Sequence, residues 1–329
     1  MNRHFAPGPP GGEFALIESL FDESHFSRTG EGLGDDGFIL RPGAGETWVV
    51  STDASAEGVH YRLDWVPPEE AMRKALLANL SDINAMGGRT RLAFFNLGAC
   101  RDWDGTRMSS MGEVLREMEG NYGFRVAGGD TVRKSGESFF AFTLLGRVEG
   151  RPLLRSQARP GHRIYLSGLL GGSAAGLSLL SQGLMPAQHP EWEAYYSAHL
   201  RPAPPLELGP ALAARPGLVA AIDVSDGLSS ELGHLAQQSG CRLVVEWSKL
   251  PYDAGLARLP GGEAWKDWVL HGGESYQLLF TGDFARNDLE ALAGAAGFRE
   301  IGRVEPGSGV GIVDETGMEE ELASKGWSH

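Results

Sequence analysis

Aspartates beside small residues recur along this chain, each next to an apolar run. Three segments show the pattern, at residues 49–53 (VVSTD), 126–131 (VAGGDT) and 221–227 (AIDVSDG), and Asp35-Asp36 and Asp82 add to it. Carboxylates presented by loops beside small residues are the hard oxygen ligands that Mg²⁺ prefers, and protein-bound Mg²⁺ is usually shared with substrate phosphates. The pattern therefore predicts a divalent-cation site that handles phosphorylated molecules.

Each aspartate taken singly has a plainer interpretation. Aspartate at a strand end or a helix start commonly forms a turn or caps the helix. Asp226, for example, could cap a helix that carries Leu228, Leu232 and Leu235. For the whole set the metal interpretation is favoured, because carboxylates gathered on one sheet edge without a cation would repel one another. That they gather is an expectation, which spacing alone leaves open.

Anion-binding groups are less clearly marked. The glycine-rich segment 168–173 opens a predicted helix and is a candidate phosphate cradle. It lacks the sequence patterns of a P-loop or a dinucleotide fold, so a plain tight turn is an equal alternative. Arg133, Lys134 and Arg155 are candidate phosphate partners, with a solvated surface role as the alternative. His60 could donate to an anion or be purely structural.

The elements that must position these residues alternate between helix and strand, which predicts a mixed α/β class. The first half shows a short helix at 13–21, strands at 47–51, 92–97, 124–127 and 139–148, and a strong helix at 68–86. Pro67-Pro68 and Gly87-Gly88 suit the ends of that helix, and Met72, Leu76, Leu80 and Ile83 form its apolar stripe. Asn79 and Asp82 share the adjacent face.

A polar, turn-rich break at residues 149–152 is the expected domain boundary, giving an N-terminal metal- and ATP-binding domain (1–150) and a C-terminal substrate-contacting domain (151–329). The second half shows strands at 163–167, 219–224, 242–247 and 276–281. One expected helix opens at the glycine-rich segment 168–173 and runs through Leu180, and the others are at 211–214 and 226–238.

Composition and charge exclude several classes of function. The 329 residues carry a net charge of -14, which argues against a protein that binds nucleic acid or anionic lipid through charge. Two cysteines and the lack of a signal-like or membrane-spanning apolar run predict a cytoplasmic protein. Motifs of covalent catalysis and of zinc hydrolases are missing, so phosphoryl transfer driven by metal and positioning is the leading reaction class.

Eight motifs in order, spanning nearly the whole chain from Gly12 to Trp327, resemble the thiamine-monophosphate kinase family of the aminoimidazole ribonucleotide synthetase-like superfamily. They are Gly34-Asp35-Asp36, Ser51-Thr52-Asp53 with Glu57-Gly58-Val59-His60, Lys74-Ala75-Leu76 with Asn79-Leu80-Ser81-Asp82, Gly128-Gly129-Asp130-Thr131, Gly171-x-Ser173-Ala174-Ala175-Gly176-Leu177, His199-Leu200-Arg201-Pro202, Ile222-Asp223-Val224-Ser225-Asp226-Gly227-Leu228, and Gly272-Gly273-Glu274 with Tyr276.

The resemblance implies a two-domain fold whose N-terminal sheets pair in a homodimer, with nucleotide bound between the domains. It also implies ATP-dependent, Mg²⁺-requiring transfer of the γ-phosphoryl group to thiamine monophosphate, which gives thiamine diphosphate. Matching positions give a metal set of Asp36, Ser51, Thr52, Asp53, Asp82, Asp130, Asp223 and Asp226. Gly129, Asp130, Arg155 and Ser225 match nucleotide contacts, and His60, Glu274 and Trp327 match substrate contacts. No catalytic base is expected, since the acceptor phosphate is already anionic.

The chain departs from the family pattern at three positions. Ser275 and Gln277 replace the acidic residues of Gly-Glu-Asp-Tyr-Glu, and Pro205 stands where an arginine is common. These changes predict altered support around the substrate and leave two alternatives open: another ATP-using enzyme of the superfamily, or a non-catalytic sensor of Mg²⁺ and nucleotide. Trp327 could stack on a thiamine ring or lie in a C-terminal core.

Overall fold

The computed structural model describes residues 35–43, 45–294 and 296–326, so the helix expected at 13–21 and Trp327 lie outside the described residues. A five-stranded sheet forms the first unit, in the order β1-β2-β5-β3-β4. Its strands are β1 (Phe38–Leu40), β2 (Thr47–Ala56), β3 (Gly88–Cys100), β4 (Arg125–Lys134) and β5 (Phe139–Val148). The pair β3–β4 is parallel and the other pairs are antiparallel.

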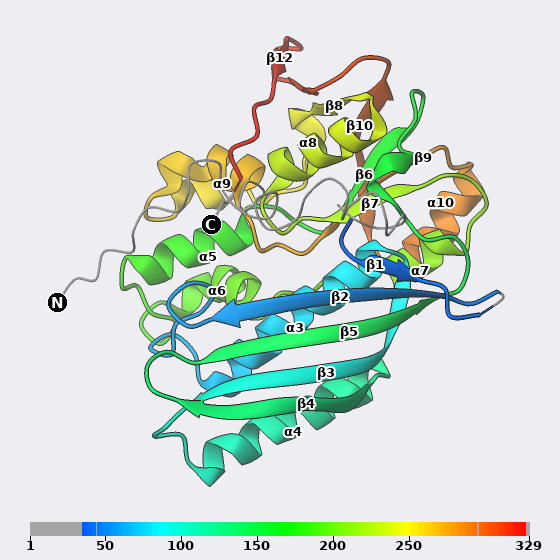
Figure 1. Ribbon diagram of the computed structural model, residues 1–329. Coiled ribbons are helices and arrows are strands. Elements are labelled where there is room, and N and C mark those ends of the chain that lie inside the picture. The colour runs from blue at the N-terminus through cyan, green and yellow to red at the C-terminus, as the bar shows by residue number, and fades with distance from the viewer. Residues whose placement is uncertain (1–34, 44, 295, 327–329) are drawn as a thin grey trace, which may run out of the picture.

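A seven-stranded sheet forms the second unit, in the order β12-β11-β8-β10-β6-β9-β7 (Figure 1). The strands are β6 (Arg163–Ser167), β7 (Ala220–Asp223), β8 (Arg242–Glu246), β9 (Leu278–Gly282), β10 (Phe298–Glu305), β11 (Val310–Val313) and β12 (Glu319–Glu321). The helices of this unit are α5 (Gly172–Ser181), α6 (Glu193–Leu200), α7 (Leu208–Ala213), α8 (Leu228–Ser239), α9 (Trp265–His271) and α10 (Arg286–Ala293). Short 3₁₀ turns lie at Arg155–Gln157, Pro190–Trp192, Trp247–Lys249, Leu256–Arg258 and Gly262–Ala264. The expected mixed α/β class is confirmed.

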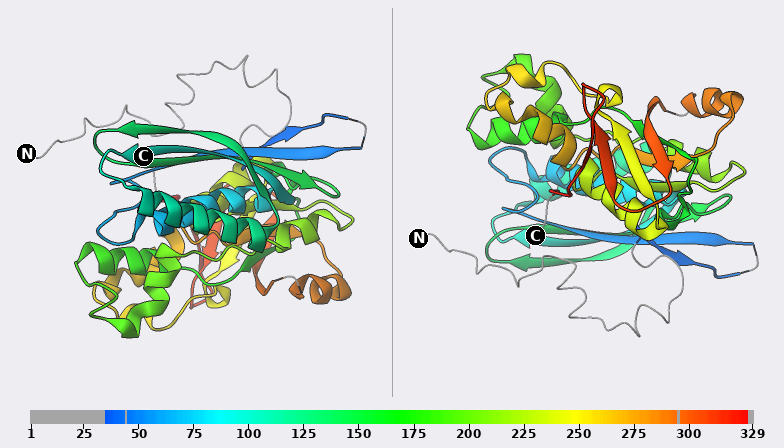
Figure 2. Two further views of the ribbon diagram at one scale, coloured as in Figure 1. Left: turned by 90° about the horizontal axis from the view of Figure 1, so that it is seen from below. Right: turned by 90° about the horizontal axis from the view of Figure 1, so that it is seen from above.

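Helix α3 (Pro68–Ala85) lies between the two units and is buried along most of its length (Figure 2). Pro68 and the acidic Glu69 and Glu70 favour its start, as expected. One side packs on β2 and β5 of the first sheet, while the other side faces β7, α6 and α7. Because the helix is enclosed from both sides, its polar residues Lys74 and Asn79 are buried as well.

Helix α4 (Gly105–Tyr122) covers the same face of the first sheet as α3 (Figure 2). No described helix or strand covers the opposite face, which is termed the open face below. Phe38, Leu40, Phe94 and Val132 expose 37–45% of their surface there. Among the described residues, no helix is long and apolar enough to cross a lipid bilayer.

Two of the acidic segments lie inside strands, which corrects the expectation that they form loops after strands. Ser51, Thr52 and Asp53 are within β2, where residues 52–56 pair with residues 139–143 of β5. Gly129 and Asp130 are within β4, which pairs with β3 across a register shift. Gly129 allows this pairing, because its φ is +147° and a Cβ atom there would lie 1.8 Å from the Phe95 carbonyl oxygen.

The strand expected at 276–281 begins later, at Leu278. Glu274 and Tyr276 have φ angles of +57° and +51°, which no strand residue adopts. The segment before β9 is therefore a turn that carries Glu274, rather than a strand start.

Candidate active site

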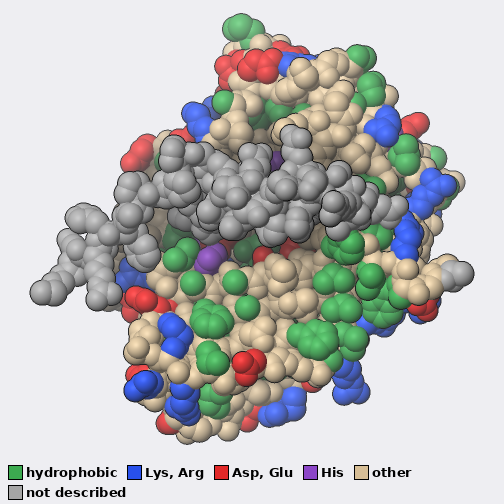
Figure 3. All heavy atoms as spheres, in the orientation of Figure 1, with side chains coloured by type: hydrophobic (Ala, Val, Ile, Leu, Met, Phe, Trp, Pro, Cys, Tyr) green, Lys and Arg blue, Asp and Glu red, His purple; other side chains and the backbone are tan. Residues whose placement is uncertain are grey.

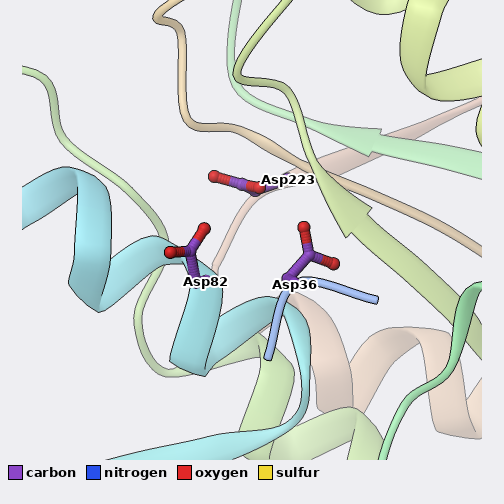
Figure 4. A group of neighbouring side chains, drawn as sticks. All are labelled: Asp36, Asp82 and Asp223. Carbon is purple, nitrogen blue, oxygen red and sulfur yellow. The ribbon is translucent and has the colours of Figure 1, made fainter. Parts of the chain in front are cut away.

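Three aspartates from distant parts of the chain meet at the junction of the two units. Asp36 precedes β1, Asp82 lies in the last turn of α3, and Asp223 ends β7. One carboxylate oxygen from each lies within 4.8 Å of the other two, and Figure 4 shows the three groups turned toward one another. The first two belong to the N-terminal unit and the third to the C-terminal unit.

Neighbouring hydroxyl groups hold two of these carboxylates in place. Ser51 Oγ donates to Asp82 Oδ2 at 2.7 Å, and Ser81 Oγ donates to Asp223 Oδ2 at 2.6 Å. Arg155 pairs with Asp36 at 2.8 Å. The other oxygen of Asp223 is buried and has no hydrogen-bond partner among the described residues.

The electrostatics of this cluster favour a bound cation. Burial raises the pKa of Asp82 well above its usual value, and the charges of Asp53, Asp223 and Asp36 raise it further. Burial, followed by the charge of Asp36, raises the pKa of Asp223 in the same way. The positive charge of a hard divalent cation would offset both causes, and the unsatisfied oxygen of Asp223 could serve as one of its ligands. The donor set present therefore fits Mg²⁺.

Three of the remaining predicted ligands, Thr52, Asp53 and Asp130, lie in strands of the first sheet and are distributed over both of its faces. Asp53 lies on the same face of β2 as Ser51, close enough to act on Asp82. Thr52 points to the open face, where its hydroxyl contacts the Phe142 carbonyl oxygen at 3.1 Å and Thr143 Oγ1 at 2.9 Å. The structure does not bring the Thr52 hydroxyl to the three aspartates.

Asp130 and Gly129 also lie apart from the cluster within one chain. Register pairs link Ala54 to Ala141, Ala141 to Asn96 and Asn96 to Asp130, so β5 and β3 separate Asp130 from β2. Three strand spacings amount to about 14 Å. Asp130 is exposed on the open face of the edge strand β4.

The loop between β7 and α8 carries Ser225 and Asp226, and it is fixed by a buried glutamate. Glu231 Oε1 accepts hydrogen bonds from the Asp226 backbone N–H at 2.9 Å and from Ser225 Oγ at 3.4 Å. Burial raises the pKa of Glu231 to about 8. Helix α8 takes Gly227 as its N-cap, so the alternative interpretation of Asp226 as the capping residue does not apply.

Two predicted substrate contacts, His60 and Glu274, line one small pocket together with Ser55, Lys74 and Tyr276. His60 Nδ1 accepts the Ala56 backbone N–H at 3.1 Å. Glu274 forms an ion pair with Lys74 at 2.7 Å, and His199 Nδ1 lies 3.3 Å from its second oxygen. The third predicted contact, Trp327, is outside the described residues.

The residues that were weaker candidates for binding an anion contact neighbouring groups of the protein. Arg133 donates to the carbonyl oxygens of Arg101 and Trp103, and Lys134 contacts the Glu137 carbonyl oxygen. In the glycine-rich segment 168–173, Gly171 caps α5 with φ +81°, and Ser173 Oγ contacts His199 Nδ1 at 3.2 Å. That segment thus supports the Glu274 pocket through His199.

The residues at the three departures from the family pattern make local hydrogen bonds. Ser275 donates to the Val224 carbonyl oxygen at 3.2 Å, and Gln277 accepts from Ser167 Oγ at 2.9 Å. The carbonyl oxygen of Pro205 accepts the backbone N–H of Leu208 at the start of α7. None of the three groups joins the acidic cluster.

Sequence reasoning did not assign roles to Lys74, His199 and Glu231, although all three lie at the site. Lys74 and His199 stand within two motifs of the family resemblance, Lys74-Ala75-Leu76 and His199-Leu200-Arg201-Pro202, which was the available signal. Glu231 lies outside those motifs, and its partner Asp226 is in the loop before α8.

Comparisons with known proteins agree with this geometry. Residues 34–148 match the family model of the AIR synthase related protein N-terminal domain, and residues 159–315 match that of the C-terminal domain. Thiamine-monophosphate kinase of Escherichia coli (strain K12) is 37% identical over 290 residues, which cover 87% of each chain. The chain belongs to the thiamine-monophosphate kinase family. The family's Bacillus subtilis member is 35% identical over 85% of this chain and 86% of its own.

The same family is found among solved structures. AaThiL, complexed with AMPPCP and TMP, superposes with a TM-score of 0.82 at 30% identity and covers 97% of both chains. The family enzyme from Stenotrophomonas maltophilia K279a superposes with a TM-score of 0.75 at 32% identity, covering 91% of this chain and 96% of its own.

Proposed function

We propose that this protein is an ATP-dependent kinase that transfers a γ-phosphoryl group to the phosphate of thiamine monophosphate, giving thiamine diphosphate and ADP. The observation that carries the proposal is the convergence of Asp36, Asp82 and Asp223 beside the pocket that holds Glu274. Family membership supports the same substrates, since a relative of closely similar fold is complexed with AMPPCP and TMP.

The reaction places few demands on acid–base or covalent catalysis by the protein. The acceptor phosphate is an anion at neutral pH, so no side chain has to remove a proton from it. The obstacle is the repulsion between two phosphorylated molecules, which calls for positive charge and alignment. Bound Mg²⁺ would supply that charge, with Asp36, Asp82 and Asp223 as the proposed core of its ligands and Ser51, Asp53 and Asp226 as further proposed ligands.

The chain's own residues orient the two substrates. Ser51 and Ser81 fix the carboxylates of Asp82 and Asp223, and Arg155 is placed beside Asp36 for a nucleotide phosphate. Ser225, in the loop that follows Asp223 and is fixed by Glu231, is assigned to the nucleotide. His60 and Glu274 are assigned to the thiamine part of the acceptor, and Trp327 remains a predicted contact.

We further propose that the working form is a homodimer that joins two open faces. The exposed apolar side chains on that face support this arrangement, and Figure 3 shows several of them on the lower half of the molecule. Thr52, Gly129 and Asp130 lie on strands of this face, too far apart to act together within one chain. A two-fold pairing would allow the Gly129-Asp130 segment of one subunit to approach Thr52 of its partner.

Two further expectations are kept as proposals. The division at residues 149–152 into an N-terminal unit and a C-terminal unit fits the position of the two sheets. A cytoplasmic location fits the two cysteines, Cys100 and Cys241, both of which carry free thiols.

Product analysis tests the function. We expect the purified protein, given ATP, Mg²⁺ and thiamine monophosphate, to form thiamine diphosphate and ADP in equal amounts, as followed by ³¹P NMR. ADP without the diphosphate would indicate another acceptor and reject this kinase activity. Binding of ATP without any turnover would instead favour the sensor function.

A further inference from the structure

Glu274 is held by two polar side chains from two other elements. Lys74 of α3 forms an ion pair with Oε1 at 2.7 Å, and His199 of α6 lies 3.3 Å from Oε2. Ser173 at the start of α5 contacts the same His199 nitrogen at 3.2 Å. The two carboxylate oxygens are therefore engaged separately, which fixes the plane of the group.

This cluster is costly to bury. The side chains of Lys74 and His199 are only 8% and 3% exposed. Taking an ammonium group and a carboxylate out of water carries a large desolvation cost, and a buried ion pair is often no more stabilising than apolar residues of the same size. Fold stability alone thus gives no reason for a buried lysine at this position of α3.

The charges around Glu274 keep it ionised. Burial would raise its pKa, but nearby positive charge, first that of Lys74, outweighs burial and lowers the pKa below its usual value. Burial, followed by the charge of Lys74, lowers the pKa of His199 to about 4, so His199 is neutral near pH 7. Lys74, His199 and His60 are the charged or titratable groups that act on the carboxylate, and Tyr276 lines the same pocket.

The backbone of Glu274 is strained as well. Its φ is +57°, a region that non-glycine residues seldom adopt, and its N–H donates to the Ser225 carbonyl oxygen at 2.7 Å. Such strain persists only when the surroundings enforce it, and it clusters at ligand-binding positions. The turn and the two side chains together aim one carboxylate at the pocket that also contains His60.

We propose that Lys74 and His199 are positioning residues that hold Glu274 as an oriented anion, so that it binds the positively charged ring portion of the acceptor substrate. The proposal rests on the proposed function, in which Glu274 contacts the thiamine part. Neither residue needs to touch the substrate, and each acts through the carboxylate.

Calorimetric binding of thiamine monophosphate without ATP, as a function of pH, tests the proposal. We expect Lys74→Met to weaken binding at least about tenfold at pH 7, because the carboxylate loses its counter-ion. The loss should shrink as pH rises, since the pKa of Glu274 goes up in the variant and protonation removes the charge that attracts the ring. Lys74→Arg should restore most of the affinity.

A double-mutant cycle separates this role from a structural one. In a Glu274→Gln background, Lys74→Met should weaken binding no further. The matched control is Arg73→Met, which removes a neighbouring ion pair of α3 with Glu117 outside the pocket and should leave binding unchanged. If Lys74→Met does not fold, His199→Asn provides the same cycle without leaving a charge unpaired.

Additive losses, or a loss that does not vary with pH, would overturn the proposal. Failure of the proposed function gives a different result, namely normal binding of thiamine monophosphate by the wild type with no diphosphate formed. Absence of wild-type binding would overturn both.

Discussion

Asp82 is acted on by three other carboxylates and by one hydroxyl donor, and it lies where α3 reaches the second unit. Its raised pKa reflects burial and the charges of Asp53, Asp223 and Asp36. A site of this kind is unfavourable to the metal-free fold and favourable once a cation binds, because ligand binding stabilises the native state.

Asp82→Asn separates these two effects. Without Mg²⁺ we expect the variant to be more stable by about 1 kcal/mol, since one repelling charge is removed without loss of shape. Its turnover should fall by more than the ~10–100-fold typical of residues that only support a ligand. Urea unfolding in EDTA and in Mg²⁺, together with the product assay, measures both quantities.

Asp64→Asn is the matched control, because the Asp64 side chain is 59% exposed and, within the part of the chain that the structure describes, its ion pair is with the neighbouring Arg62. Its stability should change by less than about 0.5 kcal/mol. A destabilised Asp82→Asn variant would contradict the repulsion, and near-normal turnover at saturating Mg²⁺ would remove Asp82 from the metal set.

Individual residues were predictable to different degrees. Asp36, Asp82 and Asp223 could be expected together, because Asp223 follows an apolar strand segment, Asp36 and Asp82 stand beside Gly37 and Ser81, and all three lie in motifs of the family resemblance. The partners Lys74, His199 and Glu231 could not, because their roles depend on distances between α3, α6 and the turn at Glu274, and none of these follows from local spacing.

At the level of elements, β4 depends on a glycine. A Cβ atom at Gly129 would lie 1.8 Å from the Phe95 carbonyl oxygen, in a backbone conformation that L-residues rarely adopt. We expect Gly129→Ala to destabilise the fold by about 2–4 kcal/mol in urea unfolding. Gly120→Ala in α4, where nothing lies within 4 Å, should instead stabilise it by about 0.5–1 kcal/mol. If both changes had the same effect on stability, β3 and β4 would be able to move apart and accommodate a Cβ atom at position 129, contrary to this prediction.

Local signals predicted some elements better than others. Helix α3 and strands β5 and β6 agree with the expected ranges, since strong apolar periodicity and clear boundaries mark them. Helix α4 was not expected, because only Met111, Val114 and Met118 are buried on it. The two acidic segments were expected as loops, because glycine and aspartate are poor strand formers. Pairing with β5 and β3 overrides that preference.

At the scale of the whole molecule, the open face leaves part of the predicted site unassembled in one chain. Complementation tests whether a partner completes it. Asp82→Asn and Asp130→Asn should each be inactive alone. After mixing, denaturation and refolding in equal amounts, we expect about a quarter of the wild-type turnover, because half of the dimers are mixed and each mixed dimer has one intact site.

No recovery in the mixture, with dimers present by light scattering, would place Asp130 in the same subunit as Asp82 or remove it from the site. A monomeric wild type with full activity would reject the dimer itself.

The course of α3 through the middle of the molecule has a consequence for substrate size. Asp82 and Lys74 lie eight residues apart on one rigid helix, about 12 Å along its axis. Asp82 and the ammonium group that pairs with Glu274 are therefore held at a set separation, because both side chains belong to the same helix. The length of the helix between these two residues thus sets a distance for the acceptor. Its anionic end and its cationic end must be separated by a similar distance if one is to reach the three aspartates and the other Glu274.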